Sequence, residues 1–295
     1  MMRILLLILT NFAVMGVLFV SMNIIGGLLG FNMSSGSMGG FMVMALIMGF
    51  GGSFVSLLMS KWMAKRSMGV NVIETPNTAQ ERWLVETVRR QAEKAGIGMP
   101  EVGIFYSPDP NAFATGANRN SALVAVSQGL LDNMTADEVE AVLGHEIGHV
   151  ANGDMVTQTL LQGVVNTFVI IFARLIGMAV DNFFRRSDDQ SGGAGFGYYI
   201  GSMVAQVVLG FAASAIVMWF SRWREFHADK AGADLAGRQK MIAALRRLQQ
   251  GHSAQDLPGG MAAFGISGGF SSGIQKLFTT HPPLEDRIAA LENMR

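Results

Sequence analysis

The sequence predicts a mainly α membrane protein, in which four hydrophobic helices accompany a small α+β domain assembled from two chain segments. Three observations predict this fold class. Half of the 295 residues are hydrophobic and only 15% are charged, unlike an ordinary soluble protein. Residues 4–60 contain no Asp, Glu, Lys or Arg, and two later stretches are also uncharged. Polar regions with helical and strand patterns lie between and after these stretches.

The N-terminal region, residues 1–60, is expected to form a pair of transmembrane helices. Its apolar runs at residues 4–25 and 41–59 are each long enough to cross a bilayer without burying a charge. The first run could alternatively be a cleaved signal peptide, because Arg3 precedes it and small residues follow. It is longer than the usual apolar core of a signal peptide, however, and a second apolar run follows almost at once. We therefore favour two membrane helices.

Basic residues predict the orientation of these helices. The loop between the first two apolar runs carries no charge, whereas Lys61, Lys65 and Arg66 follow the second run. Short segments rich in Lys and Arg stay in the cytoplasm, so the N-terminus and the region after Lys61 are expected to be cytoplasmic. Arg222 and Arg224, just after the last apolar run, agree with this orientation. The formal net charge of +0 gives no indication of nucleic-acid binding.

Residues 61–154 are expected to form the first part of the α+β domain. Residues 79–95 have a helical pattern, with Trp83, Val88 and Ala92 on one side. The stretches "MPEVGIFYS" and "SALVAVSQGLL" are apolar or alternating, are rich in β-branched and aromatic residues, and are bounded by Pro, Gly and Asn. Such stretches are typical of strands.

The helix expected next contains the motif "AVLGHEIGHVANGD". Thr135 and Glu138 have the S/T-x-x-E spacing of a helix start. His145 and His149 then lie one turn apart on one face and can direct their imidazoles at one ion, whereas Glu146 points to the side. This H-E-x-x-H pattern is typical of zinc peptidases in which the glutamate is the general base. The alternative is a pair of surface histidines without a metal, but two of only five histidines at ligand spacing favour the metal site.

Residues 155–221 are expected to form a second hydrophobic hairpin. Its first uncharged stretch, residues 155–173, contains several Thr, Gln and Asn side chains and is the weaker membrane candidate. The second, residues 190–221, has small residues every four positions, which lets helices pack closely in lipid. These residues are Gly193, Gly197, Gly201 and Ala205, of which the first two alternatively belong to a loop. We favour a hairpin that crosses the membrane over a peripheral one, because the second stretch is long enough to span it.

A third metal ligand is needed, and the sequence restricts its position. The metzincin extension of the motif requires a glycine and a histidine where this chain has Asn152 and Met155. Asp154 is too close to His149 to fold back easily as a ligand, and no His, Asp or Glu follows before Asp181. Asp181, Asp188 and Asp189 are expected in the loop between the two later apolar stretches. With no cysteine in the chain, the ligand must be His, Asp or Glu, and the segment "REFHADKAG" remains.

Within that segment, Glu225 and Asp229 lie one turn apart on one helix face, whereas His227 points away by about 200°. We therefore expect Glu225 to bind the metal and Asp229 to accept the free N–H of a metal-binding histidine. His227 is expected to be a surface or packing residue.

The rest of residues 222–295 completes the α+β domain. Residues 238–249 have a helical pattern, and "THPPLEDRIAALENMR" has Leu284, Ile288 and Leu291 spaced for one buried helix face. The Gly- and Ser-rich residues 258–273 between these helices are expected to form a loop that can gate the site.

Several motifs together resemble the HtpX family of bacterial membrane-bound zinc metalloproteases. They are "NAFATG", "SALVAVSQGLL", "HEIGH", "SRWREFHAD" and "THPPLEDR", in this order, and the likeness covers essentially the whole chain. The resemblance implies a zincin-like domain in which His145, His149 and Glu225 bind one Zn²⁺ and Glu146 is catalytic. It also implies that Asp229 supports a ligand and that His281 and Arg287 lie near the active site.

The resemblance further implies a multi-pass protein of the bacterial inner membrane, with its active site facing the cytoplasm. Its substrates would be unfolded, misfolded or damaged membrane proteins, and its partners would belong to membrane protein quality control. Glu146 would take a proton from the attacking water and pass it to the leaving amine. His281 would either donate a hydrogen bond to the oxyanion or cap the last helix.

A peptidase must also hold its substrate in an extended conformation. Residues 121–127, with Val124 and Val126, are expected to form an edge strand beside which a peptide adds as a further strand. The residues just before it would lie beside the cleft; they include Asn111, Ala114, Thr115 and Gly116. The alternative is that residues 121–127 form an inner strand, buried within the sheet.

Two other functions are alternatives to a quality-control protease. An intramembrane CAAX prenyl protease shares the zinc motifs but needs more transmembrane helices than four. A membrane scaffold or chaperone-like protein would use zinc structurally, for which four protein ligands are usual. His227 as a fourth ligand would favour the scaffold.

Overall fold

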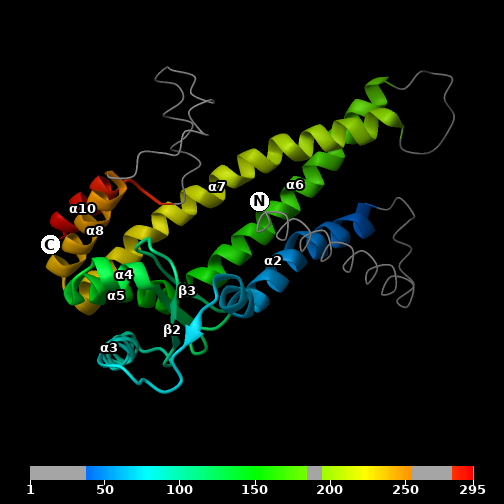
Figure 1. Cartoon of the computed structure of the whole chain (residues 1–295). Coiled ribbons are helices and arrows are strands. Elements are labelled where there is room, and N and C mark those ends of the chain that lie inside the picture. Colours follow the sequence, from blue (N-terminus) through cyan, green and yellow to red (C-terminus); the bar gives the residue numbers. More distant parts are fainter. Residues whose placement is uncertain (1–37, 185–194, 254–280, 295) are drawn as a thin grey trace. The chain divides into compact units, whose positions relative to one another are not determined.

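The computed structural model describes residues 38–184, 195–253 and 281–294 (Figure 1). The first predicted membrane helix, residues 4–25, and the predicted loop at residues 258–273 lie outside the described residues. The chain divides into two compact units, each assembled from two segments. The helical unit comprises Met1–Ser56 and Gln158–Val217, and the α+β unit comprises Leu57–Thr157 and Met218–Arg295.

The described part of the chain contains three helices long and apolar enough to cross a membrane. They are α2 (Met38–Met68), α6 (Asp154–Phe184) and α7 (Phe196–Ala236). The predicted apolar stretches at residues 41–59, 155–173 and 190–221 lie in these helices, except for the start of the last, which is outside the described residues. The protein is thus mostly helical with a small mixed sheet, and three of the four predicted membrane helices are described.

Small residues bring the helices of the helical unit close together. A Cβ added to Gly49 of α2 would lie 2.7 Å from the backbone nitrogen of Thr167 in α6. A Cβ added to Gly201 of α7 would lie 2.8 Å from Cβ of Val180 in α6. Gly201 and Ala205 are buried, and Gly197 lies in the helix rather than in a loop. The small-residue spacing in residues 197–205 therefore marks a helix contact, as predicted.

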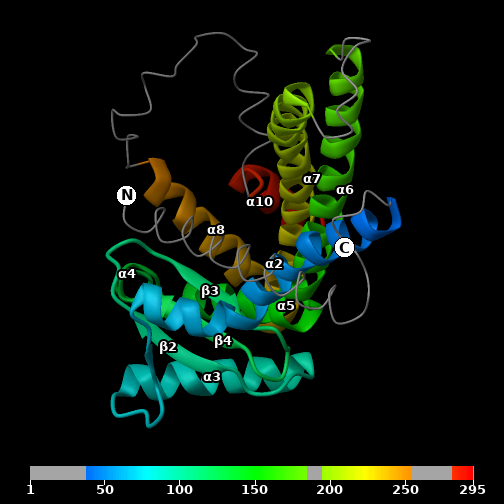
Figure 2. The same cartoon turned by 90° about the vertical axis from the view of Figure 1, so that its right-hand side faces the viewer.

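The α+β unit contains a four-stranded mixed sheet (Figure 2). Its strands are β1 (Asn71–Val72), β2 (Glu101–Phe105), β3 (Ala112–Thr115) and β4 (Leu123–Ser127), and their order is β1-β2-β4-β3. β4 runs parallel to β2 and antiparallel to β3. Among the described strands, β3 therefore forms one edge of the sheet.

The prediction that residues 121–127 form an edge strand was wrong. β4 pairs on both sides, and every residue of the strand is buried. Val124 and Val126 are 0% and 1% exposed and belong to the hydrophobic core, so their side chains are not available to a substrate. The alternative of an inner strand is correct. The strand ends at Ser127, whose hydroxyl accepts a hydrogen bond from the Leu130 N–H and caps α4 (Gln128–Asn133).

Two capped helices contribute to the core beside the sheet. α3 (Ala79–Ala95) has the predicted bounds, and a capping box of Thr78 and Glu81 starts it. α5 (Ala136–Asn152) starts with the predicted capping box of Thr135 and Glu138. Side chains from both helices join those of the sheet in one cluster, which includes Leu84, Val88, Val124, Leu143 and Ile147. This packing holds α5, with its two histidines, in a fixed position.

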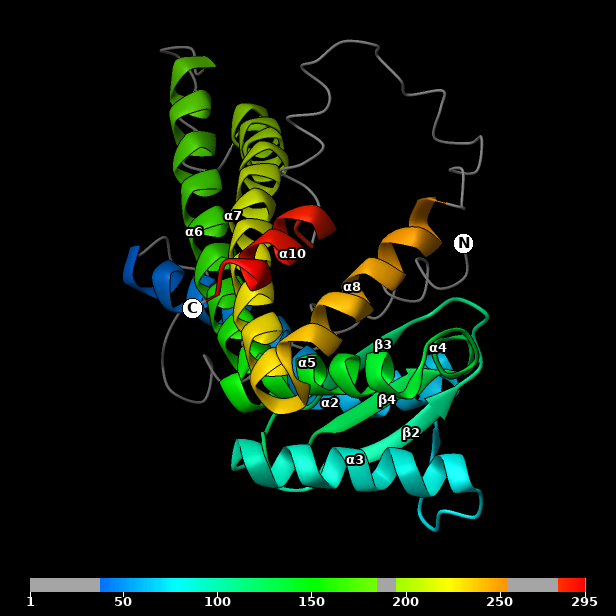
Figure 3. The same ribbon diagram turned by 90° about the vertical axis from the view of Figure 1, so that its left-hand side faces the viewer.

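The last two described helices pack against each other (Figure 3). They are α8 (Arg238–Ser253) and α10 (Leu284–Glu292). Ile288 and Leu291 are buried and Leu284 is half-buried, as their spacing predicted. Pro283 precedes α10, and no side chain caps its start, so the alternative in which His281 caps this helix is wrong.

Both apolar helices of the predicted hairpin continue directly from elements of the α+β unit. Gly153, in the left-handed region at φ 69°, ends α5, and Asp154 begins α6. α7 contains 41 residues and is therefore roughly 60 Å long, about twice the thickness of the hydrocarbon core. Its apolar run ends before Arg222, and the rest of the helix belongs to the α+β unit.

Candidate metal centre

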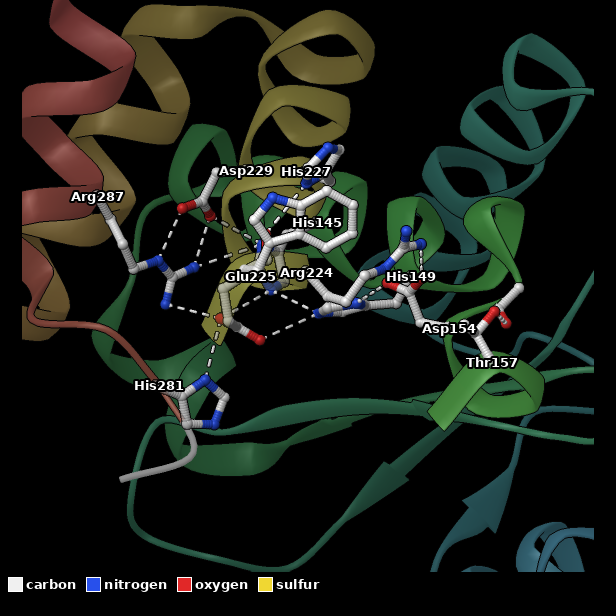
Figure 4. A network of polar contacts seen from close by, with 12 residues as sticks. His145, His149, Asp154, Thr157, Arg224, Glu225, His227, Asp229, His281 and Arg287 are labelled. Atoms are coloured by element: carbon white, nitrogen blue, oxygen red, sulfur yellow. Dashed lines mark hydrogen bonds and ion pairs between the residues drawn. The ribbon is translucent and has the colours of Figure 1, made fainter. Parts of the chain in front are cut away.

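Two helices bring three potential metal ligands together (Figure 4). His145 Nε2 and His149 Nε2, both from α5, are 3.1 Å apart. Glu225, from α7, has Oε1 at 3.3 Å from His149 Nε2 and Oε2 at 3.7 Å from His145 Nε2. Among the described residues, these three form the one group whose donor atoms all lie within 4.8 Å of one another. Two imidazoles and a carboxylate that converge in this way suit a divalent transition metal.

Glycines allow α5 and α7 to approach closely enough for this geometry. A Cβ added to Gly148 would lie 2.7 Å from Cβ of Ala231, and one added to Gly144 would lie 3.2 Å from Cα of Gly232. A glycine thus precedes each histidine of the motif and faces the helix that carries Glu225. The sequence shows these glycines, but only the packing shows what they do.

The Nδ1 atom of His145 faces a carboxylate, and this carboxylate pairs with an arginine. Asp229 Oδ1 lies 2.9 Å from His145 Nδ1, as the helix spacing predicted. Arg287, from α10, forms a bidentate pair with Asp229 at 2.7 and 2.5 Å, and its Nη1 is 3.1 Å from Glu225 Oε2. When Nδ1 of a histidine donates to a carboxylate, its Nε2 lone pair is left for a metal.

His149 has a similar support, which the sequence reasoning missed. Asp154 Oδ2 lies 2.7 Å from His149 Nδ1, and the other carboxylate oxygen of Asp154 pairs with Arg224. By sequence alone, Asp154 is an unsuitable metal ligand and Arg224 is a basic residue at the end of an apolar run. One feature of the sequence could have indicated this contact. Asp154 directly follows Gly153, and a glycine at the end of a helix can turn the chain back toward it.

The charges around the ligands keep both carboxylates ionised. Burial alone would raise the pKa of Glu225, but hydrogen bonds with His149 and His281 and the charges of His145 and Arg287 hold it far below the ordinary value. Burial would likewise raise the pKa of Asp229, yet Arg287 and His145 lower it. Burial lowers the pKa of the His149 imidazole, but its hydrogen bond to Glu225 and the charge of Glu146 raise it overall.

Glu146 and His281 lie next to this group. Among the described residues, Glu146 is half-buried and makes no hydrogen bond or ion pair, while its charge helps to raise the pKa of His149 and Arg287. Its carboxylate is therefore near the ligands without being held by a partner. His281 Nδ1 is 3.0 Å from Glu225 Oε2, and its side chain is 65% exposed. The ring is thus open to a ligand approaching the site.

His227 lies apart from the three potential ligands, as its helix position predicted. It is exposed, its Nδ1 is 3.0 Å from the carbonyl oxygen of Trp223, and its ring lies on that of Trp223.

We expect His227→Ala to leave the affinity for metal within about twofold of the wild type, since no ligand is lost. Competition with a chelator measures this, and a substantially weaker affinity would indicate a fourth ligand.

The residues predicted to bind the substrate lie in two different places in the structure. Ala114 and Thr115 lie in the edge strand β3, and Asn111 and Gly116 flank it. β3 packs against α5, which carries His145 and His149. Val124 and Val126 lie in the core and are separated from this edge. A small hollow at the end of β3 is lined by Thr115, Gly116, Arg119, Val150 and Met155, among others.

The family follows from a comparison of the whole chain with known proteins. A family model described as "Peptidase family M48" matches residues 78–295, which contain every residue of the site. The chain belongs to this family. "Protease HtpX" of Xanthomonas axonopodis pv. citri is 58% identical over 289 residues, covering 98% of this chain and 96% of that protein. "Protease HtpX" of Thioalkalivibrio sulfidiphilus is 56% identical over 297 residues and covers 100% of both chains.

Among solved structures, that of S. mikatae Ste24p has the same fold. The TM-score is 0.67 at 18% sequence identity, and the match covers 97% of this chain and 64% of that one. The resemblance to the HtpX family is thus confirmed, and the protein is a membrane-bound metalloprotease. The comparisons give no support to the scaffold alternative.

Proposed function

We propose that this metalloprotease is a zinc endopeptidase that cleaves unfolded or misfolded membrane proteins. The observation that carries the proposal is the convergence of His145, His149 and Glu225, with both histidine Nδ1 atoms facing carboxylates. Three protein ligands of this kind leave a fourth position for a water molecule, as in catalytic zinc sites. The absence of cysteine and the exposed position of His227 argue against a closed structural site.

The chain's own residues would divide the chemistry as follows. A zinc ion held there would supply Lewis acidity, which lowers the pKa of a water molecule to about 7 and polarises the peptide carbonyl. Glu146 takes the proton of the attacking water and passes it to the leaving amine. His281, beside Glu225 and open to solvent, donates a hydrogen bond to the developing oxyanion. Arg287 and Asp229 hold Glu225 and His145 in place.

Zinc-dependent cleavage tests this function directly. The protein, purified in detergent and stripped of metal, is given one equivalent of zinc and incubated with an unfolded polypeptide. We expect cleavage to appear with zinc, to disappear with a chelator, and to be absent from His149→Ala, because that variant lacks a ligand. A protein that binds one zinc but cleaves none of several unfolded substrates would contradict the proposal.

The substrate would add to the sheet at β3 rather than at β4. The N–H of Ser127 donates to the carbonyl of Asn111 at 2.8 Å, and hydrogen-bonded pairs alternate along an antiparallel ladder. In this register Phe113 bonds to β4, whereas the N–H and C=O groups of Ala112 and Ala114 point to the open edge. Backbone groups at an edge accept a peptide of almost any sequence, which suits broad specificity.

Ala114→Pro tests this edge, because proline removes an N–H that β4 does not use. We expect kcat/KM to fall by about 10-fold, which corresponds to the loss of one backbone hydrogen bond to the substrate. The zinc content should not change. Ala114→Val keeps the N–H and should retain activity. Phe113→Pro removes a bond within the sheet and should instead lower stability. Equal activity in Ala114→Pro and Ala114→Val would contradict the edge role.

The proposed location is the inner membrane, with the α+β unit in the cytoplasm. Lys61, Lys65 and Arg66 follow the apolar run of α2, and Arg222 and Arg224 follow that of α7. Basic residues at these positions favour the cytoplasmic side. Damaged membrane proteins, and other components of membrane quality control, would meet the site there.

A further inference from the structure

Both metal-binding histidines face the same kind of partner, although only one of these partners follows from the motif. Nδ1 of His145 faces Asp229, which is paired with Arg287. Nδ1 of His149 faces Asp154, which is paired with Arg224. The site therefore contains two carboxylate–arginine pairs, one behind each imidazole (Figure 4).

The second pair is built from the two helices that hold the ligands. Asp154 follows Gly153, whose left-handed conformation ends α5 and turns the chain so that the next side chain reaches back to His149. Arg224 directly precedes Glu225 on α7. A contact between Asp154 and Arg224 thus connects the end of the histidine helix to the helix of the third ligand.

The burial of this pair shows that it is not a surface ion pair. Asp154 is 6% exposed, and the Arg224 side chain is 16% exposed. A buried carboxylate without a cationic partner is costly, so Arg224 stabilises the carboxylate of Asp154 that faces the imidazole. Exposed pairs, by contrast, contribute little to structure.

We propose that Asp154 and Arg224 form a positioning pair for the metal site. Asp154 fixes the tautomer and the ring plane of His149, so that its Nε2 lone pair faces the ion, and Arg224 holds Asp154 in that role. Asp154 is also the first residue of α6. The position at which this apolar helix begins therefore places the carboxylate that orients His149. The inference rests on the proposed function, since it assumes that zinc binds at this group.

Zinc affinity measured by competition with a chelator tests the pair. We expect Asp154→Asn to weaken binding by about 10- to 100-fold, the usual effect of removing the carboxylate behind a zinc histidine. Arg224→Gln should weaken it by about 10-fold, and Arg224→Lys, which keeps the charge, should recover part of the loss. The double variant Asp154→Asn/Arg224→Gln should be no worse than Asp154→Asn alone, because the two residues act through one contact.

Two exposed residues of α7 provide matched controls. Asp234→Asn and Lys230→Gln make the same changes of charge away from the site and should bind zinc as the wild type does. Melting of the metal-free proteins shows whether each variant folds. If Asp154→Asn does not fold, the two Arg224 variants still test the pair. Arg224→Gln should bind zinc more weakly than the wild type, and Arg224→Lys should recover part of this loss.

The outcomes separate this inference from the proposed function. A wild type that binds no zinc would overturn the proposed function itself. A wild type and folded variants that all bind zinc with equal affinity would overturn only the positioning pair. Weak binding by Asp154→Asn and Arg224→Gln, with normal binding by both controls, supports it.

Discussion

Replacing Glu146 by glutamine is expected to lower kcat for peptide hydrolysis by about 10²- to 10⁴-fold while the metal stays bound. Glutamine has the shape of glutamate but cannot take a proton from the attacking water. Glu146 lies beside His145 in the sequence but is not among the three converging ligands, so its loss should not release the ion. Cleavage of an unfolded polypeptide and metal content, measured on the same samples, check both expectations.

Glu93→Gln is a suitable control for this variant. Glu93 is an exposed residue of α3, and its replacement removes one negative charge without touching the site. Its kcat should equal that of the wild type. If Glu146→Gln retained activity within a few fold, another group would have to be the general base; if it lost the metal as well, Glu146 would have a role in binding it.

Replacing Arg287 by methionine is expected to lower the free energy of unfolding of the metal-free protein by about 3–5 kcal/mol. Arg287 is 7% exposed and is the cationic partner of both Asp229 and Glu225. Methionine fills a similar volume but leaves two buried carboxylates without this partner. Denaturant titration in detergent, in the absence of metal, measures the loss.

The pair of Arg246 with Glu292 provides the matched control for Arg287. It also joins an arginine to a carboxylate in the α+β unit, but the side chains are 58% and 48% exposed. Exposed pairs contribute at most about 1 kcal/mol, so Arg246→Met should change stability by less than that. Equal losses in the two variants would contradict the structural role of the buried network.

The sequence predicted those elements whose pattern is local. The bounds of α3, the capping box of α5 and the positions of the three described apolar helices follow from spacing and composition within one segment. The convergence of His145 and His149 follows from the helix period, because residues four apart share a face. Glu225 was predicted within the segment "REFHADKAG", because it shares a helix face with Asp229, whereas His227 points away.

The sequence did not predict which strand lies at the edge of the sheet. The run "LVAVS" has no polar alternation, which is typical of a strand buried on both faces, but an apolar run by itself does not show its neighbours. The order β1-β2-β4-β3 depends on the parallel pairing of β2 with β4, and this pairing involves residues more than 20 positions apart. Only that pairing placed Ala112–Thr115 at the edge.

The sequence by itself thus determined the apolar helices, the histidine helix and the chemistry of the ligands, because each depends on the period and composition of one segment. The tertiary structure decided which side chains support those ligands. Asp154 reaches His149 because of the left-handed turn at Gly153. Arg224 and Arg287, which pair with Asp154 and Asp229, lie on other helices. Such contacts depend on the packing of α5, α7 and α10, which brings together groups far apart in the chain.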